Sequence, residues 1–230
     1  MHLVLASGSI WRKELLSWLN LPFQVIVSDF DETSITSNDP EELVASLAVA
    51  KAQVVTEAIR HQSHPETKRL HPELEGKHYE PTLVIGADTV IVVSREDGSL
   101  QILGKPKDEQ EARFMLTALR AKTHQVYTGV AIVNVETGEK VVEVDRSLVT
   151  FGNFSDQELS LYLQTKEYVD KAGSYQILGH ARRFLDNLEG SLTGVVGLPL
   201  QKTANLLETM GLIIPVNVRE VVLAKTGFPD

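Results

Sequence analysis

Thr82-Leu-Val-Ile-Gly-Ala-Asp-Thr-Val-Ile-Val-Val93 is a β-rich, largely apolar run that predicts a buried strand. We expect this strand to be interrupted at Gly86 and Asp88, as happens where a buried strand reaches a functional site. An ionised carboxylate between apolar runs is costly unless it meets a cation, a metal or several donors. The run therefore predicts a functional carboxylate at Asp88. The alternative is a strand-end aspartate whose oxygens accept hydrogen bonds from turn N–H groups.

Upstream of this run, the sequence predicts a strand, a tight loop and a helix. Residues 3–6 are a short apolar run, and the Ser-Gly-Ser loop at 7–9 opens an amphipathic stretch with apolar residues at helical spacing. A further strand is expected at 23–27, and a helix is expected from Asp39-Pro40 to about residue 60. The segment 61–81 carries four histidines and several prolines without any period, so we interpret it as a solvated loop insertion.

Downstream, strands and helices continue to alternate, which is typical of an α/β fold. Two long strands, 124–135 and 140–151, are joined at Thr137-Gly138 and predict a hairpin, which we expect to form a second lobe. Helices are expected at 108–119, from Ser155 to about Leu163, and from Pro199 to Met210. No internal repeat is seen, and residues 1–230 are interpreted as one domain with two lobes.

Composition limits the function classes. The 230 residues, 43% of them apolar, can bury one sizeable core or two small lobes that share a cleft. A net charge of -9 argues against general binding to nucleic-acid backbones or anionic membranes. The absence of cysteine removes disulfides, thiolate zinc sites and catalytic thiols. With no leader-like or long apolar segment, we expect a soluble, cytoplasmic protein.

Polar loops supply further candidates for binding a phosphate. The loop at 7–9, followed by Arg12 and Lys13, offers free N–H groups, hydroxyls and cations. The alternative, favoured without further context, is that Ser9 is an ordinary N-cap and Arg12 an exposed helix charge. Glu32 is a candidate second metal carboxylate, although acidic clusters of this kind are more often solvated turns.

Two tight turns also place lysines where a phosphate could bind. Lys105 lies in Gly104-Lys105-Pro106, after a strand that is expected at 100–103, and Asp170 and Lys171 open a second polar turn that ends at Gly173. Surface solvation is the usual fate of such lysines and is the alternative for each. The histidines at 61–81 lack the paired spacing of a zinc site. The dinucleotide fingerprint, the Walker-type loop and the nucleophile elbow are all absent from the sequence.

Taken in order along nearly the whole chain, these motifs resemble the Maf family of nucleoside triphosphate pyrophosphatases. Residues 5–16 resemble the opening signature of the family, and residues 85–90 resemble its catalytic strand. In chain order, the matching residues are Leu5-Ala6-Ser7-Gly8-Ser9 with Arg12, Glu14, Leu15 and Leu16; Lys51; Ile85-Gly86-Ala87-Asp88-Thr89-Val90; Gly104-Lys105-Pro106; His124 with Thr128-Gly129-Val130; Asp170-Lys171-Ala172-Gly173; and Val195-Val196-Gly197-Leu198-Pro199-Leu200. Separate motifs in one order are hard to obtain by chance.

The resemblance implies an elongated α/β fold of the Maf/ITPase-like type, in which a mixed sheet with helices forms two lobes around a cleft. It also implies a homodimer, a divalent cation such as Mg²⁺ or Mn²⁺, and hydrolysis at the α-phosphorus of a nucleoside triphosphate. Asp88 would activate water, with Glu32 and Asp88 holding the metal. The residues implied to bind the triphosphate are Ser7, Arg12, Lys51, Lys105, Asp170 and Lys171.

Members of the family differ at three positions around the base of the nucleotide, which are Trp11, Thr89 and Leu178 in this chain, and these residues leave the identity of the base open. Family members that act on dTTP and UTP carry arginine, threonine and glutamine there, and those that act on 7-methyl-GTP carry tryptophan, glutamine and glutamate. Trp11 could stack on a cationic methylated guanine, Thr89 favours pyrimidines, and Leu178 offers no hydrogen bond. A dTTP- or UTP-like substrate and a modified nucleotide such as 7-methyl-GTP are therefore both expected candidates.

A function of another class is also compatible with the resemblance. The family's name is tied to septum formation, so a non-catalytic regulator of cell division is the alternative to an enzyme. The charged residues Asp88, Lys51, Lys105 and Glu32 are all present, which favours the enzyme.

Overall fold

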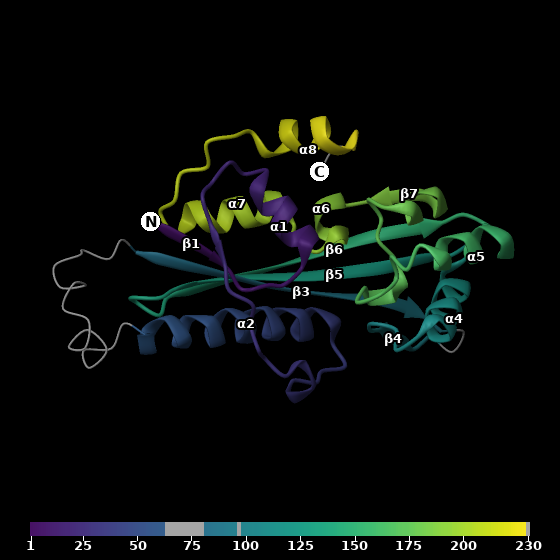
Figure 1. Ribbon diagram of the computed structural model, residues 1–230, viewed down its shortest axis with the longest axis horizontal. Coiled ribbons are helices and arrows are strands. Elements are labelled where there is room, and N and C mark those ends of the chain that lie inside the picture. Colours follow the sequence, from purple (N-terminus) through teal and green to yellow (C-terminus); the bar gives the residue numbers. More distant parts are fainter. Residues whose placement is uncertain (63–80, 96–97, 229–230) are drawn as a thin grey trace.

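A computed structural model describes residues 1–62, 81–95 and 98–228 and shows a central sheet covered by helices on both faces (Figure 1). In the described residues the seven strands follow the order β2-β1-β3-β5-β6-β7, and β4 pairs with β3 beside this path. Their bounds are β1 (His2–Leu5), β2 (Gln24–Val25), β3 (Thr82–Ser94), β4 (Leu100–Leu103), β5 (Thr123–Asn134), β6 (Lys140–Phe151) and β7 (Leu185–Glu189). The prediction of a mixed α/β sheet is confirmed.

Strand β3 runs without a break, so the interruption expected at Gly86 and Asp88 is wrong. Antiparallel pairing with β5 continues through both positions, which lie opposite Ala131 and Gly129. Gly86 is needed for close packing instead, because a Cβ there would lie 2.1 Å from the carbonyl oxygen of Ala48. The missing side chain lets the long helix α2 (Pro40–Gln62) lie directly on the middle of β3.

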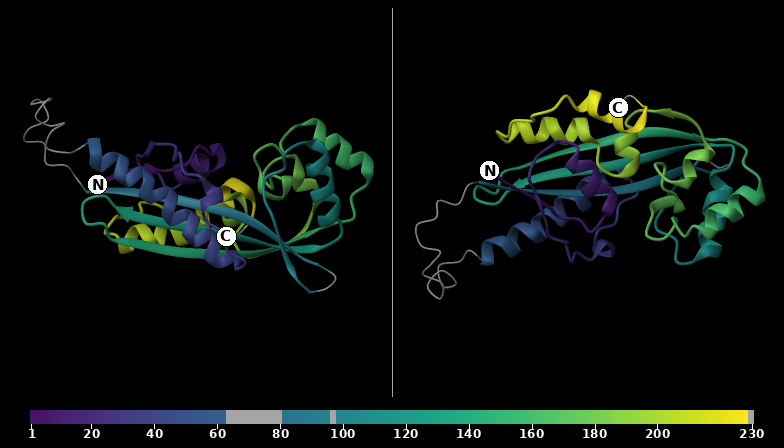
Figure 2. Two further views of the ribbon diagram at one scale, coloured as in Figure 1. Left: turned by 90° about the horizontal axis from the view of Figure 1, so that it is seen from below. Right: turned by 45° about the horizontal axis from the view of Figure 1, so that its top comes forward.

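Helices cover the two faces of the sheet unequally. Helix α2 lies on one face, while α1, α6 and α7 lie on the other, with α8 outside them (Figure 1). Helices α4 and α5 gather at the far end of the long strands (Figure 2). The bounds are α1 (Ile10–Ser17), α4 (Glu109–Leu119), α5 (Asp156–Gln164), α6 (Leu192–Val196), α7 (Leu200–Thr209) and α8 (Val218–Thr226).

The predicted hairpin is present, but it does not form a lobe of its own. Strand β5 pairs with β3 from residue 83 to residue 92, so the hairpin is the centre of the single sheet. Two large hydrophobic clusters lie along this sheet: one includes Leu15, Ile85 and Leu207, and the other includes Leu116, Phe151 and Phe184. The long strands contribute to both clusters and give the elongated shape of the molecule (Figure 2).

Most of the strands and α-helices expected from the sequence are confirmed. Strand β7 and the α-helices α6 and α8 were not predicted. Residues 63–80 of the predicted insertion lie outside the described residues. No helix in the described part of the chain has the length and apolar character needed to cross a membrane.

Candidate active site at the open edge of strand β3

One edge of β3 has a gap in its strand pairing. Strand β1 pairs with residues 82–85 and β4 with residues 91–94, so in the described residues 86–90 have β5 on one side and no strand on the other. Because β1 is parallel and β4 antiparallel to β3, both strands end at this gap. The loops that follow them, residues 7–9 and 104–106, therefore reach the same stretch of β3 from opposite ends.

The first loop places Arg12 inside the site. Ser9 is the N-cap of α1, and its Oγ accepts a hydrogen bond from Arg12 N at 3.3 Å. The Arg12 guanidinium donates to Gly197 O at 2.8 Å, to Thr89 Oγ1 at 3.1 Å and to the buried Ser7 Oγ at 3.5 Å. The N-cap interpretation is thus right for Ser9, while the interpretation of Arg12 as an exposed helix charge is wrong.

Helix α2 places Lys51 against Asp88. Lys51 Nζ lies 2.5 Å from Asp88 Oδ1 and 2.8 Å from Glu32 Oε1. Asp88 is only 6% exposed and Lys51 8%, so each ion is largely removed from water and is compensated mainly by the other. Asp88 is therefore satisfied by a cation in mid-strand, and not by turn N–H groups at a strand end.

Glu32 joins this pair from the 3₁₀ turn η1 (Glu32–Ser34), and its side chain is 42% exposed. Burial pushes the pKa of Glu32 up, but the hydrogen bond and charge of Lys51, helped by Lys105, outweigh it and lower the pKa overall. Burial lowers the pKa of Arg12, because it disfavours the charged guanidinium, although the negative charges of Asp88 and Glu32 act in the opposite direction. Glu32 is thus kept ionised in a cluster that contains more cations than carboxylates.

The second loop brings in Lys105, whose half-exposed ammonium lies 3.7 Å from Glu32 Oε1. The turn that contains Asp170 and Lys171 is tied to this loop, because Gly173 N donates to Gly104 O at 3.0 Å. Lys171 Nζ donates to the backbone of its own turn, and Asp170 is exposed. Among the described residues, neither side chain has a hydrogen bond or ion pair to the central cluster. The structure therefore assembles Lys105 with the cluster and leaves Asp170 and Lys171 at its rim.

The two candidate metal ligands meet the basic requirement for sharing a cation. Oxygens of Glu32 and Asp88 both contact one atom, Lys51 Nζ, so they are close enough to bind a common positive charge. Carboxylate oxygens suit Mg²⁺ and Mn²⁺, and Mg²⁺ is commonly held by one or two carboxylates together with substrate phosphates. No group of three or more His, Asp or Glu residues in the described ranges forms a metal site by itself. The donor set fits a cation that arrives with a phosphate ligand.

Thr89 follows Asp88 on β3, so its side chain leaves the sheet on the opposite face. Its Oγ1 lies 2.9 Å from Thr128 Oγ1, which in turn lies 2.8 Å from Gly194 O. Thr128 Oγ1 has one hydrogen, which it donates to Gly194 O or to Thr89 Oγ1. Thr89 Oγ1 also accepts from Arg12, so this oxygen is held by donors from both β5 and α1.

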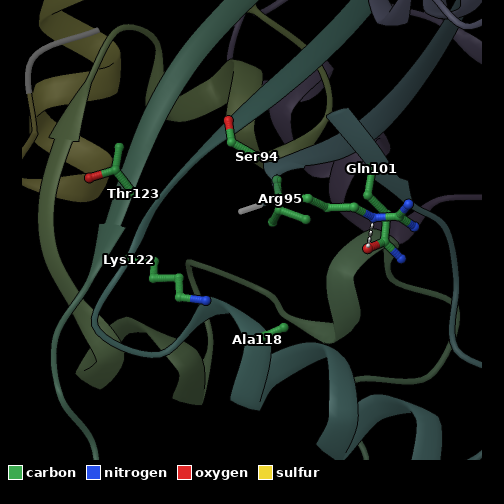
Figure 3. Close-up of a pocket in the computed structure, with 7 residues that line it drawn as sticks. Ser94, Arg95, Gln101, Ala118, Lys122 and Thr123 are labelled. Carbon is green, nitrogen blue, oxygen red and sulfur yellow. Dashed lines mark hydrogen bonds between the residues drawn. The ribbon is translucent and has the colours of Figure 1, made fainter. Parts of the chain in front are cut away.

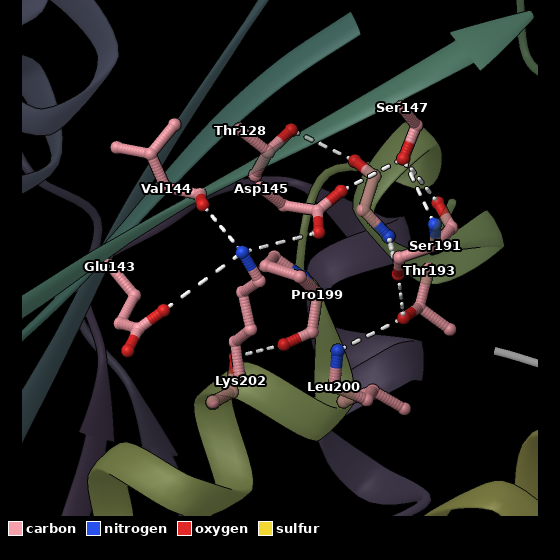
Figure 4. A network of polar contacts seen from close by, with 12 residues as sticks. Thr128, Glu143, Val144, Asp145, Ser147, Ser191, Thr193, Pro199, Leu200 and Lys202 are labelled. Atoms are coloured by element: carbon pink, nitrogen blue, oxygen red, sulfur yellow. Dashed lines mark hydrogen bonds and ion pairs between the residues drawn. The ribbon is translucent and has the colours of Figure 1, made fainter. Parts of the chain in front are cut away.

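A polar network behind Thr128 holds helices α6 and α7 against β6 (Figure 4). Ser147 Oγ donates to Asp145 Oδ2 at 2.8 Å and accepts from Ser191 N at 3.0 Å, and Lys202 Nζ donates to Val144 O at 2.6 Å. This network fixes the segment that carries the Gly194 and Gly197 carbonyls. It was not predicted from the sequence, because its residues are scattered over more than fifty positions.

Two of the three positions that are expected to determine base choice line one cavity. Trp11 and Leu178 face a cavity of about 450 Å³ whose other lining residues are Ile10, Glu14, Trp18, Arg182, Lys225 and Thr226. Thr89 is not among the lining residues and is linked to α1 through Arg12. Sequence reasoning missed Arg182, Lys225 and Thr226, since no motif or spacing marks them. A second cavity, of about 430 Å³, lies at β3, β4 and α4 and contains none of the predicted site residues (Figure 3).

Comparison with known proteins gives a consistent result. The family profile described as "Maf-like protein" matches residues 2–210. A Bacillus cytotoxicus protein named "dTTP/UTP pyrophosphatase" is 39% identical over 205 residues, which are 89% of this chain and 93% of that protein. A Bacillus cereus protein of the same name is 38% identical over 206 residues, covering 90% of this chain and 94% of that protein. The chain belongs to the Maf family.

Proposed function

We propose that this chain is a metal-dependent nucleoside triphosphate pyrophosphatase that acts on a dTTP- or UTP-like nucleotide. The observation that carries the proposal is the cluster of Asp88, Lys51, Glu32 and Arg12 at the unpaired edge of β3. The Bacillus relatives named dTTP/UTP pyrophosphatase, similar over nine-tenths of the chain, support the same reaction and base class.

The chain's own cations receive the triphosphate. Arg12, Lys51 and Lys105 lie around the gap and exceed the carboxylates Glu32 and Asp88 by one positive charge. Ser7 Oγ and the N–H groups at the start of α1 are the donors on the other side of the gap. Preorganised donors and cations of this kind stabilise the charge that moves to the leaving pyrophosphate.

Asp88 acts as the general base in this proposal. It takes a proton from a water molecule whose oxygen forms a bond to the α-phosphorus, while the bond from that phosphorus to the bridging oxygen of the β-phosphate breaks. The contact with Lys51 Nζ holds the Asp88 carboxylate in place. A divalent cation, which we expect Glu32 and Asp88 to hold, supplies positive charge to the phosphate oxygens and makes water more acidic. The products are the nucleoside monophosphate and pyrophosphate.

The test is release of monophosphate and pyrophosphate from a panel of dTTP, UTP, CTP, GTP and 7-methyl-GTP with Mg²⁺ or Mn²⁺. Asp88→Asn should lower kcat by a factor of about 10³ or more, while Asp186→Asn, at an exposed position, should retain turnover. Circular dichroism of both variants checks the fold. Wild-type inactivity on every nucleotide would favour the non-catalytic regulator, and turnover by Asp88→Asn would remove Asp88 from the chemistry.

The expected site roles of Asp170 and Lys171 are part of this proposal, with contacts to the triphosphate at the rim of the gap. The homodimer and the cytoplasmic location stay predictions. They can be measured by light scattering and by cell fractionation.

A further inference from the structure

The cavity that contains Trp11 and Leu178 has a wall made by the C-terminal helix. Lys225 and Thr226 of α8 face this cavity, together with Arg182 from the 3₁₀ segment η4 (His180–Phe184). The family profile matches only residues 2–210, so α8 lies outside the residues on which the family assignment rests. The lining residues from α8 are therefore not accounted for by the family motifs.

Helix α8 is fixed in place by packing and by hydrogen bonds. Asn217 caps its N-terminus, and Val218 and Val222 are buried in the same hydrophobic cluster as the leucines of α1. At its other end the Arg182 guanidinium donates two hydrogen bonds to Thr226 O, at 3.2 and 3.3 Å. A helix held at both ends can present Lys225 to the cavity in a defined position.

The charges around this cavity are unbalanced. Lys225 and Arg182 bring two cations, and Glu14 brings one carboxylate, which accepts a hydrogen bond from Trp18 Nε1 at 3.0 Å. Lys225 Nζ lies 5.9 Å from the centre of the Trp18 ring. Within the part of the chain that the structure describes, Lys225 has no ion-pair partner. The cavity thus has a net positive charge beside two indole rings.

We infer that α8, through Lys225, makes this cavity select a neutral base with carbonyl oxygens and reject a cationic base. This inference rests on the proposed function, since it takes the cavity to be where the base of the nucleotide binds. The Lys225 ammonium can donate to a base carbonyl and repels a positively charged ring, whereas the Trp11 indole can stack on either. Tryptophan at position 11 is therefore compatible with a uracil-like base in this chain.

The chain itself supplies the reporter for a direct test. It contains two tryptophans, Trp11 and Trp18, and both line the cavity. Tryptophan fluorescence is titrated with UMP and with 7-methyl-GMP, below neutral pH so that the methylated base keeps its positive charge. The protein is wild type, Lys225→Met, Lys225→Glu or Arg219→Glu. Arg219 is exposed on the same helix and does not line the cavity, so its reversal changes net charge equally and is the matched control.

We expect the preference for UMP over 7-methyl-GMP, measured as a ratio of Kd values, to fall by about threefold in Lys225→Met and by about tenfold in Lys225→Glu. Arg219→Glu should keep the wild-type ratio. An unchanged ratio in Lys225→Glu, an equal change in Arg219→Glu, or no fluorescence response to either nucleotide would overturn the inference. Because binding is measured without turnover, inactivity of the wild-type enzyme on UTP would count against the proposed function alone.

Discussion

The middle of strand β3 and the far end of the long strands bury polar groups in opposite ways. At the gap in β3, Lys51 and Asp88 are buried as an ion pair. Near the far end, His124 is 2% exposed, lies 2.9 Å from the Tyr175 hydroxyl through Nε2 and packs edge-on against Phe151. Burial lowers the pKa of His124 to about 4, so this ring is neutral at pH 7. One region keeps its buried groups charged, and the other keeps its buried polar group uncharged.

This difference separates the candidate site from the part of the fold that supports it. A buried ion pair loses its compensation when either partner is removed, so the candidate site is sensitive to any change of charge and is suited to a charged ligand. The far end is built from aromatic rings in mutual contact, including Phe151, Phe154 and Phe184. It provides a neutral core beneath the strand and turn that carry Lys105. Variants in the two regions should therefore fail in different ways.

Among variants that compare the two regions, the largest effect is expected from Lys51→Met, which keeps an unbranched side chain of similar size and removes its charge. Turnover should fall by a factor of about 10³, because a cation of the cluster is lost and Asp88 is left as a buried carboxylate without its main partner. Steady-state kinetics with the preferred nucleotide measures this loss. Lys13→Met, at an exposed position of α1, is the control and should be close to wild type. A fully active Lys51→Met enzyme would show that the buried charge is structural only.

The next effect concerns the contact that positions Lys51. In Gly86→Ala the new Cβ would lie 2.1 Å from Ala48 O, so α2 must move away from β3, and the free energy of unfolding should fall by about 3 kcal/mol. Gly152→Ala, whose Cβ would meet nothing closer than 3.9 Å, should leave stability unchanged or slightly raised. Denaturant unfolding compares the two variants. Equal stability would mean that the approach of α2 to the sheet does not depend on Gly86.

Local pattern predicted much of this fold. The strands, the hairpin and the helices around Lys51 and Leu116 follow from apolar periodicity, turn residues and caps such as Ser155, whose capping box with Glu158 is present. Helix α8 was missed because its buried apolar positions, Val218 and Val222, form a single i, i+4 pair in a short segment, which is too little to show helical periodicity. The break expected in β3 was wrong because a glycine in a strand can mark either an irregularity or close packing, and only tertiary contacts distinguish them.

The site was predictable as a set of residue types but not as an arrangement. Asp88 and Lys51 stand out by chemistry or by family motif, yet their 2.5 Å contact depends on how α2 lies across β3. The contact between the Thr89 and Thr128 hydroxyls depends on strand register. Lys225 belongs to no motif, and its place beside Trp18 arises only from helix packing.

The neutral histidine at the far end gives a pH-dependent prediction. With a folded pKa of about 4 against 6.5 for an ordinary histidine, His124 takes up its proton more readily in the unfolded chain. Its contribution to stability is present above pH 6.5 and is lost as the pH falls toward 4, by about 2 kcal/mol at pH 5. His124→Phe keeps an aromatic ring and removes this dependence. The melting temperature should therefore fall less between pH 7 and pH 5 in the variant than in the wild type. An equal fall in the two proteins would contradict the assignment of a buried neutral ring.

The smallest effect is expected from Thr128→Val, which removes the hydroxyl between Thr89 and Gly194 on the face opposite Lys51. The buried Thr128 hydroxyl donates to Gly194 O or to Thr89 Oγ1, whereas valine has a similar shape and can make neither hydrogen bond.

Because the Gly194 carbonyl loses this donor, the free energy of unfolding should fall by about 1 kcal/mol, as measured by denaturant unfolding. Thr209→Val, at an exposed position of α7, should keep the wild-type stability. A Thr128→Val variant as stable as wild type would mean that this hydroxyl does not help to hold α6 against β5.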